Sequence, residues 1–413
     1  MPIRWKNKAR LKPQVFLDEI EKVKSVGEDG RVSYTGYEYH NSFASLLSML
    51  DVPAAISAEM DVDTLLSKAL GRAAREPKLT AASVREHLNQ IVDGEFARRE
   101  EEYRLLTSLS LRGTPPFRRL RISQQRVWIL NGAYPRKYKS RTEMVRNYAY
   151  DPALSHEHPG YSRVIVFAKA KSTRGAGTKA LNALNLVRAI MCMGSNSGME
   201  LVGNPDAPIN KIRLGQTHTL HLTSGNAATK DFWYEPSFYA SSPYTPIQPR
   251  QLARYFQNVF SKLSKCSYRN SLIPSLLRYV RALDERDQDS AAIQLWGALE
   301  SLASPGEADY AKVVRRCAFL FKEAVYHSQV LEHLREFRNS AVHSGSQSER
   351  AKSYCYQMQF YFIRLVHFHL GQGNFCRSLD EANAFLDLPV DTDMLLAQKA
   401  RVLEALRFRG IES

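Results

Sequence analysis

Apolar residues recur at helical spacing from about Pro249 to Leu370, and this periodicity limits the fold more than any other feature of the chain. In the first such segment they fall three or four apart, at Leu252, Tyr255, Phe256, Val259, Phe260 and Leu263. This spacing places them along one side of an α-helix. Similar patterns follow around residues 276–283, 290–302, 313–324 and 331–342, and a long last helix is expected over about 346–370. Because the connections are short, the sequence predicts an antiparallel all-α bundle within residues 249–413.

The chain before this bundle has a different pattern. Residues 112–245 combine β-type runs at 126–130, 163–168, 212–214 and 217–222 with a helical pattern at 178–193. Residues 1–111 read as mostly helical, and their charged run ARREEEYR is interpreted as a solvated helix face. The predicted fold class is α+β, with a mixed α/β N-terminal region and a C-terminal helical bundle. The expected domains are 1–111, 112–245 and 249–413.

The net charge and the cysteines indicate which binding partners and which cellular compartment to expect. The formal net charge of +15 favours a polyanionic partner, with nucleic acid first and an anionic membrane surface second. No apolar run approaches the roughly 18 residues of a membrane span, and the basic start lacks the apolar core of a signal peptide. The five cysteines are scattered, without a Cys-x-x-Cys pair. These features predict a cytoplasmic protein with reduced, buried thiols and no membrane partner.

A basic segment at 112–146 is the candidate RNA-binding region. It holds ten Arg or Lys residues and one acid, Glu143, with Phe117, Trp128, Tyr134 and Tyr138 interleaved. Cationic side chains neutralise phosphates, and aromatic rings stack on unpaired bases. The candidate RNA contacts are Arg118, Arg119, Arg121, Arg126, Arg136, Lys137, Lys139 and Arg141. The alternative is a solvated basic surface around one β-strand, with the aromatic residues in the core.

The candidate catalytic motif is Arg338-Asn339-Ser340-Ala341-Val342-His343. A guanidinium can stabilise a phosphate as its charge grows, and an imidazole can move the proton of a 2′-hydroxyl. Spacing alone proves little, because the Arg-x-x-x-x-His pattern also occurs at Arg213…His218 and Arg364…His369. On a helical wheel Arg338 falls within an apolar stripe formed by Leu331, Leu334, Phe337, Ala341 and Val342.

A cation within an apolar stripe needs an ionic partner or a cleft. Glu300, at the edge of the stripe predicted for residues 290–302, is the candidate partner of Arg338. Asn339 and His343 are four apart and share the neighbouring flank. The alternative to catalysis is therefore a structural Arg338–Glu300 pair, with His343 as a cation at the negative end of its helix.

This motif, together with the helix Leu295-Trp296-Gly297-Ala298-Leu299-Glu300, resembles HEPN ribonucleases of the ApeA-like subfamily. The resemblance covers about Pro249–Gly371. It implies a bundle of four or five helices, homodimerisation through the bundle, and metal-independent endoribonuclease activity without a cofactor. Many relatives act as toxins or in anti-phage defence. By position, Arg338 would contact the phosphate, His343 would be the acid/base, and Asn339 would orient the backbone or the substrate.

The expected partner is RNA, with tRNA one candidate. The alternative function is a non-catalytic HEPN scaffold that binds nucleic acid or a partner protein. His218 and His221 are three apart in a strand-like run, so they should point to opposite faces, and no metal site is predicted. The loop at 172–179 lacks the P-loop spacing and is interpreted as a plain connection, with anion binding at the following helix as the alternative.

Overall fold

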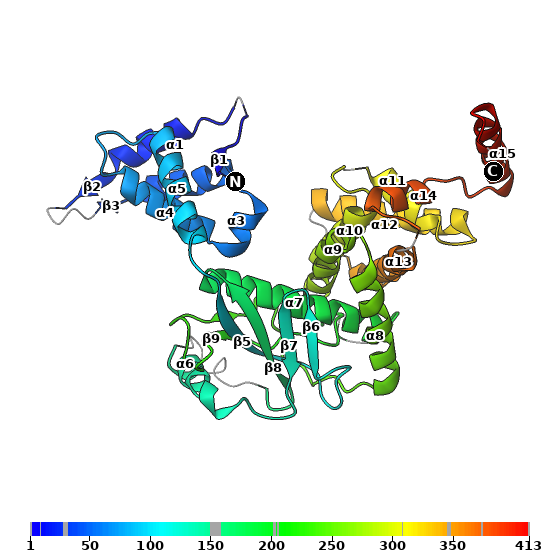
Figure 1. The fold of residues 1–413 in the computed structure, drawn as a ribbon, viewed down its shortest axis with the longest axis horizontal. Coiled ribbons are helices and arrows are strands. Elements are labelled where there is room, and N and C mark those ends of the chain that lie inside the picture. The colour runs from blue at the N-terminus through cyan, green and yellow to red at the C-terminus, as the bar shows by residue number, and fades with distance from the viewer. Residues whose placement is uncertain are drawn as a thin grey trace.

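The computed structural model describes residues 2–8, 10–27, 32–148, 158–200, 204, 206–307, 309–344, 348–372 and 375–411, without the side chains of Val26, Tyr148, His343 and Ser344. The fold class is α+β, as predicted. Figure 1 shows helices at the N-terminus, a β-sheet with a long helix in the middle, and a run of helices toward the C-terminus.

The N-terminal region is a small helical unit with its own hydrophobic core. Its helices are α1 (Pro13–Lys22), α2 (Tyr37–Met49), α3 (Ala54–Glu59), α4 (Val62–Ala73) and α5 (Ala81–Phe96). Two short antiparallel pairs accompany them, β1 (Arg4–Trp5) with β4 (Leu50–Asp51) and β2 (Lys24–Val26) with β3 (Val32–Tyr34). Thr80 caps α5 by accepting a hydrogen bond from the Ser83 amide.

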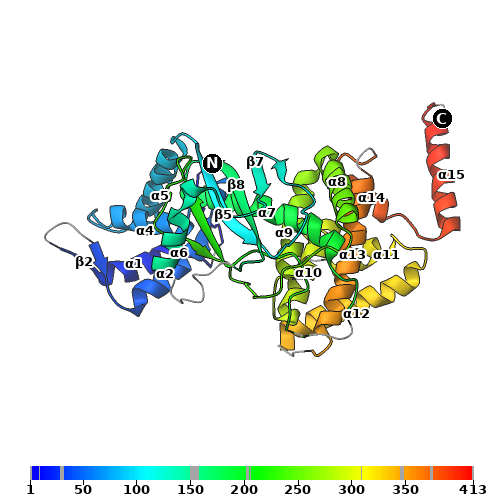
Figure 2. The ribbon, with the colours of Figure 1, turned by 90° about the horizontal axis from the view of Figure 1, so that it is seen from below.

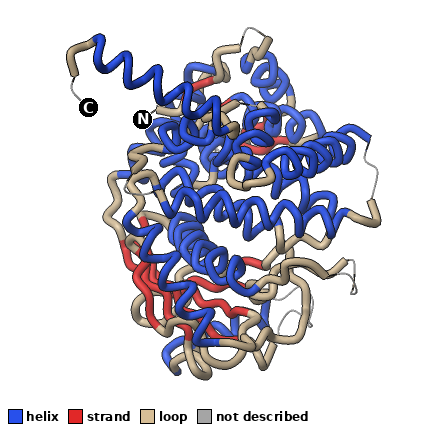
Figure 3. Tube along the Cα trace, turned by 90° about the vertical axis from the view of Figure 1, so that its right-hand side faces the viewer, coloured by secondary structure: helices blue, strands red, loops and turns tan. Residues whose placement is uncertain are grey.

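The middle of the chain forms a six-stranded antiparallel sheet in the order β10-β9-β5-β8-β7-β6. Its strands are β5 (Glu101–Leu109), β6 (Arg119–Ile122), β7 (Gln125–Ile129), β8 (Ser162–Ala170), β9 (Thr217–His221) and β10 (Trp233–Tyr234). Figure 3 shows these strands gathered at the lower left, beside the helices. The strands expected at 126–130, 163–168 and 217–222 are confirmed, whereas 212–214 contributes only an isolated bridge at Leu214.

The interpretation of residues 97–109 as helix is wrong. Helix α5 ends at Phe96, and Glu101–Leu109 is a strand that pairs with both β8 and β9. Every residue of the strand from Tyr103 to Leu109 is buried, so its apolar residues show no two-residue alternation. A strand enclosed on both faces lacks the sequence signature that distinguishes a half-buried strand from a helix.

The two faces of this sheet have different surroundings. Helix α7 (Thr173–Ser195) packs on one face, where it meets alternating apolar residues of β5, β8 and β7. A 3-10 turn η1 (Arg136–Tyr138) and α6 (Ser140–Tyr148) lie over part of the other face, around Leu106, Ile165 and Phe167. The buried ion pair Arg188–Asp284, at 2.6 Å, joins α7 to the chain that follows α9 of the bundle.

The C-terminal bundle contains α8 (Pro249–Lys265), α9 (Arg269–Ala282), α10 (Gln288–Ala303), α11 (Tyr310–Ala318), α12 (Ala324–Ser344) and α13 (Ala351–Gly371). The expected helices are present, although α11 ends at Ala318 and the helix that carries the motif is longer than predicted. Two further helices, α14 (Leu379–Leu386) and α15 (Thr392–Phe408), follow. The bundle shares one continuous core with the α7 face of the sheet.

The sequence also predicted buried thiols and no membrane span. All five cysteines are buried and unpaired, which confirms the predicted buried thiols. Within the described ranges, every helix is too short or too polar to cross a membrane.

Candidate functional site

Arg338 lies near the end of α12, half-buried against α10 and α11. Its guanidinium carbon is 4.8 Å from the centre of the Tyr310 ring, and Nη1 donates to Oδ1 of Asn339 at 3.2 Å. Its Nε is buried and has no hydrogen-bond partner among the described residues. Because a guanidinium has five N–H donors, Arg338 keeps donors for a further acceptor.

The predicted partner Glu300 is near Arg338 but does not pair with it directly. In the part of the chain that the structure describes, no ion pair joins the two side chains. Burial raises the pKa of the Glu300 carboxyl, and the positive charge of Arg338 offsets part of this rise. The Trp296 indole N–H also lowers this pKa, although Nε1 is buried and makes no hydrogen bond of normal geometry. Arg338 is therefore not neutralised by a contacting carboxylate.

The structure places Asn339 beside Arg338, half-buried and hydrogen-bonded to it. The His343 backbone lies in the last turn of α12, but its side chain is outside the described residues. Positions 339 and 343 are one turn apart on the same helix flank, as expected. The predicted buried stripe holds at Leu331 and Leu334, whereas Val342 is 46% exposed. Phe337 and Ala341 are half-buried, so the burial of the stripe decreases toward the C-terminal end of α12.

Tyr310 is a member of this cluster that the sequence analysis did not identify. It is the first residue of α11, after the Asp309 cap, and its ring lies between the Arg338 guanidinium and the Trp296 indole. Its position 28 residues before Arg338 follows no helical or strand period, so no local signal could have linked the two. The Tyr310 ring restrains the orientation of the Arg338 guanidinium through a cation–π contact.

The other two Arg-x-x-x-x-His matches occupy different environments. Arg213 and His218 are both buried, and His218 binds Thr107 at 2.7 Å and Glu235 at 3.1 Å. His369 is fully buried, while Arg364 is exposed and stacks on Phe360. Only in the 338–343 match does the arginine lie in a half-buried polar cluster at a helix end.

The second predicted site lies on the sheet face opposite α7. The strand register pairs Arg119 with Trp128 and Arg121 with Arg126, so these four side chains point to the same side. All three arginines are exposed. We call this part of β6 and β7 the basic sheet face.

Aromatic rings lie beneath the arginines of the basic sheet face. The Arg119 guanidinium is 4.5 Å from the Trp128 ring centre, and Arg126 is 4.8 Å from that of Phe167. Arg126 also pairs with Glu102 at 2.5 Å, which neutralises part of its charge. Arg119 and Arg121 therefore offer the more available charge. Phe167 is buried and Trp128 is only partly exposed, so the face offers mainly cations, which neutralise phosphates.

The other predicted RNA contacts flank this face. Arg118 is exposed and its guanidinium lies against the Asn131 side chain. Arg136 and Lys139 are exposed and, with Arg163 of β8, line a shallow pocket of about 490 Å³. Lys137 is exposed and donates to the Thr223 carbonyl at 3.1 Å.

Arg141 is not an RNA contact, contrary to the prediction. Only 3% of it is exposed, and its guanidinium donates to the Leu106 and Thr217 carbonyls, both at 3.0 Å, and to Thr219 Oγ1 at 2.6 Å. It anchors α6 to strands β5 and β9. A buried guanidinium saturated with protein acceptors cannot reach a phosphate at the surface.

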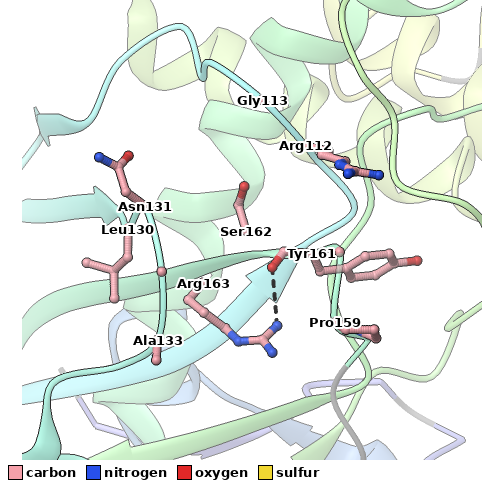
Figure 4. Close-up of a pocket in the computed structure, with 11 residues that line it drawn as sticks. Arg112, Gly113, Leu130, Asn131, Ala133, Pro159, Tyr161, Ser162 and Arg163 are labelled. Carbon is pink, nitrogen blue, oxygen red and sulfur yellow. Dashed lines mark hydrogen bonds between the residues drawn. The ribbon is translucent and has the colours of Figure 1, made fainter.

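A larger pocket of about 780 Å³ adjoins the first one, since Ala133 and Arg163 line both. Figure 4 shows Arg112 and Arg163 on its walls, with Asn131 across from Arg112. Arg163 donates to the His158 and Tyr161 carbonyls, both at 3.2 Å. Among the described residues that line it, two are cationic and none is acidic, so the pocket extends the positive surface beyond the basic sheet face.

The motif and the basic sheet face are separate surfaces. In Figures 1 and 2 the helices α8, α9 and α10 lie between α12 and the β6–β7 hairpin. Neither surface contributes a side chain to the other in the described hydrogen bonds and ion pairs. One RNA would have to extend past the bundle to occupy both.

Two minor candidates have structural explanations. His218 and His221 on β9 bind protein groups, including the Gly225 carbonyl at 3.1 Å from His221, and burial lowers the His221 pKa to about 4. In the described ranges, no group of three or more His, Cys, Asp or Glu side chains could hold a metal. At the start of α7, Glu59 of α3 pairs with Lys179 and occupies the position an anion would take.

Comparison with known proteins returned no matching family model, curated protein or solved structure.

Proposed function

We propose that this chain is a metal-independent endoribonuclease of the HEPN type, with Arg338 and His343 at its active site. The observation that carries the proposal is the state of Arg338. It is half-buried, oriented by Tyr310 and Asn339, and not paired with the nearest carboxylate. A partly desolvated cation with unused donors is suited to stabilise a phosphate that gains charge in a transition state.

In the proposed reaction His343 takes the proton of a ribose 2′-hydroxyl. The 2′-oxygen attacks the adjacent phosphorus, and Arg338 stabilises the charge on the non-bridging oxygens. The bond to the 5′-oxygen breaks and that oxygen receives a proton. The products are a 2′,3′-cyclic phosphate and a 5′-hydroxyl. Asn339 holds the guanidinium, and the basic sheet face binds the RNA. The expected setting is a cytoplasmic toxin or anti-phage effector that acts as a homodimer.

The test is cleavage of RNA by the purified full chain in the presence of EDTA. Arg338→Ala and His343→Ala should each lower the rate by ~10²–10⁴. Matched controls are Arg364→Ala and His333→Ala, because both side chains are exposed in the same bundle and lie outside the motif. Both controls should cut RNA at the wild-type rate. Inhibition by EDTA, or full activity of His343→Ala, would contradict the mechanism.

The alternative, a non-catalytic protein that binds RNA, is favoured by the separation between the basic sheet face and α12. End chemistry distinguishes the two functions. A scaffold would bind RNA in a salt-dependent manner without producing cyclic phosphate ends in wild-type or variant samples.

A further inference from the structure

Helix α15, the last helix that the structure describes, has an apolar side that belongs to neither hydrophobic core of the described residues. It is 17 residues long, and none of its residues is buried. Figures 1 and 2 show it projecting away from the bundle beyond α14. An isolated helix of this length is marginal in water, and helices in proteins are stabilised mainly by packing.

Most large apolar residues of α15 form one stripe, whereas Met394 and Phe408 lie on the other side of the helix. At 100° per residue, five aliphatic side chains fall within an arc of about 120°. They are Leu395, Leu396, Val402, Leu403 and Leu406. Leu396, Val402 and Leu403 are 57%, 55% and 37% exposed. Lys399 lies in the middle of the stripe. A single charged residue at such a position in a helix pair favours one register and lowers the stability of the pair.

Four charges lie at the two ends of α15, and Lys399, Arg401 and Glu404 lie between them. Asp391 and Asp393 lie at the N-terminal end, and Arg407 and Arg409 at the C-terminal end. On one flank of the stripe, Asp393 and Arg407 lie equally far from Ala400 in opposite directions. On the other flank, Asp391 and Arg409 do the same. The helix is therefore complementary to itself in the antiparallel direction, and antiparallel packing also opposes the helix dipoles favourably.

We propose that α15 pairs antiparallel with α15 of a second copy of this chain. With the two-fold axis near Ala400, Asp393 faces Arg407 of the second copy, and Asp391 faces its Arg409. The same register places Leu396 against Leu403 of the second copy, and Leu395 against its Leu406. One register thus pairs the end charges and the apolar stripe over a helix ~25 Å long, and it also brings the Lys399 residues of the two copies together near the axis.

An anionic membrane fits the helix less well than a second copy does. A membrane-bound amphipathic helix carries its cations along the polar face, whereas two carboxylates lie at one end of α15. The proposed pairing concerns assembly, involves residues beyond the 249–371 segment, and stands whether or not the chain cuts RNA.

The test is sedimentation velocity of the full chain over a range of micromolar concentrations. Leu403→Glu should weaken self-association at least ~100-fold, because it places a charge in the apolar stripe. Ala397→Glu, on the opposite side of α15, is the matched control and should leave self-association unchanged.

A charge exchange then tests the direction of pairing. Asp393→Arg and Arg407→Asp should each weaken self-association roughly tenfold, since each creates two like-charge contacts. A one-to-one mixture of the two variants should restore it, because both contacts become attractive in the mixed pair. Circular dichroism checks that each variant keeps its helices.

The proposal is overturned by a wild-type chain that stays monomeric, by self-association that survives Leu403→Glu, or by a mixture no stronger than either variant alone. Binding of the wild-type chain to vesicles of anionic phospholipid, without self-association, would assign α15 to a membrane instead.

Discussion

Neutralising the basic sheet face and the exposed cations that flank it should reduce the salt dependence of RNA binding by an amount set by the available charges. Four predicted contacts are suited to the experiment. Arg121, Arg136 and Lys139 are exposed and have no ion pair among the described residues, and Arg119 is exposed above Trp128. Arg126 is left unchanged because it pairs with Glu102. Arg141 is left unchanged because it is buried.

The expected magnitude follows from counterion release. Each phosphate contact to a single strand contributes about 0.7 to the slope of log affinity against log salt. Replacing the four residues with Gln should therefore lower the slope by about 2.8. If the parent and the variant bind RNA equally at a 1 M reference, the variant should bind ~200-fold more weakly at about 0.15 M salt.

The assay is fluorescence anisotropy with a labelled single-stranded RNA at several salt concentrations. Every protein carries His343→Ala, so that cleavage does not interfere with binding. The matched control removes the same charge from exposed positions of α4, α5 and the connection between them, by substituting Gln at Lys68, Arg75, Lys78 and Arg85. Its slope should equal that of the parent.

The reasoning is refuted if both quadruple variants lose the same slope. That result would mean that net charge, and not the basic sheet face, governs binding. An unchanged slope in the first variant would equally show that RNA binds elsewhere.

Two further outcomes test the structural assignments. Arg141→Gln should destabilise the protein by roughly 3 kcal/mol, because it leaves buried acceptors on β5 and β9 unsatisfied; urea unfolding with a wild-type midpoint would contradict the buried position. Hydrogen bonds from Arg316 and Arg315 lower the Asp387 pKa to about 2. Asp387 should therefore stabilise the fold fully above about pH 4, the unfolded pKa, and lose this effect as pH falls toward 2. Urea unfolding of wild type and Asp387→Asn should differ at pH 6 and converge near pH 2, and a difference that persists at pH 2 would exclude the pairing.

The helices of the bundle could be predicted because their signal is local. In α8, apolar residues three or four apart define the buried side regardless of the partner, and Leu252, Phe256, Val259 and Leu263 are all buried. The strand β8 was recognisable for a similar reason, as a short β-branched run. The arginine, asparagine and histidine of the motif were also placed on one helix by spacing alone.

Contacts between distant segments could not be predicted in this way. Strand β5 reads as a helix because α7 covers one of its faces and η1 and α6 cover part of the other, and burial of both faces removes the alternation that marks a half-buried strand. Arg141 and Arg136 are five residues apart in the same basic segment, yet one is buried and the other exposed. Their charges are equivalent in sequence, and only the packing of α6 on the sheet distinguishes them.

The sequence by itself therefore determined the helical periods, the positive charge and the residues of the motif, because each depends on neighbours along the chain. The tertiary structure decided which charges reach solvent, that Arg338 contacts Tyr310 without pairing to Glu300, and that the apolar side of α15 is not buried among the described residues. These properties depend on segments separated by tens to hundreds of residues, which meet only when the burial of apolar surface selects one packing.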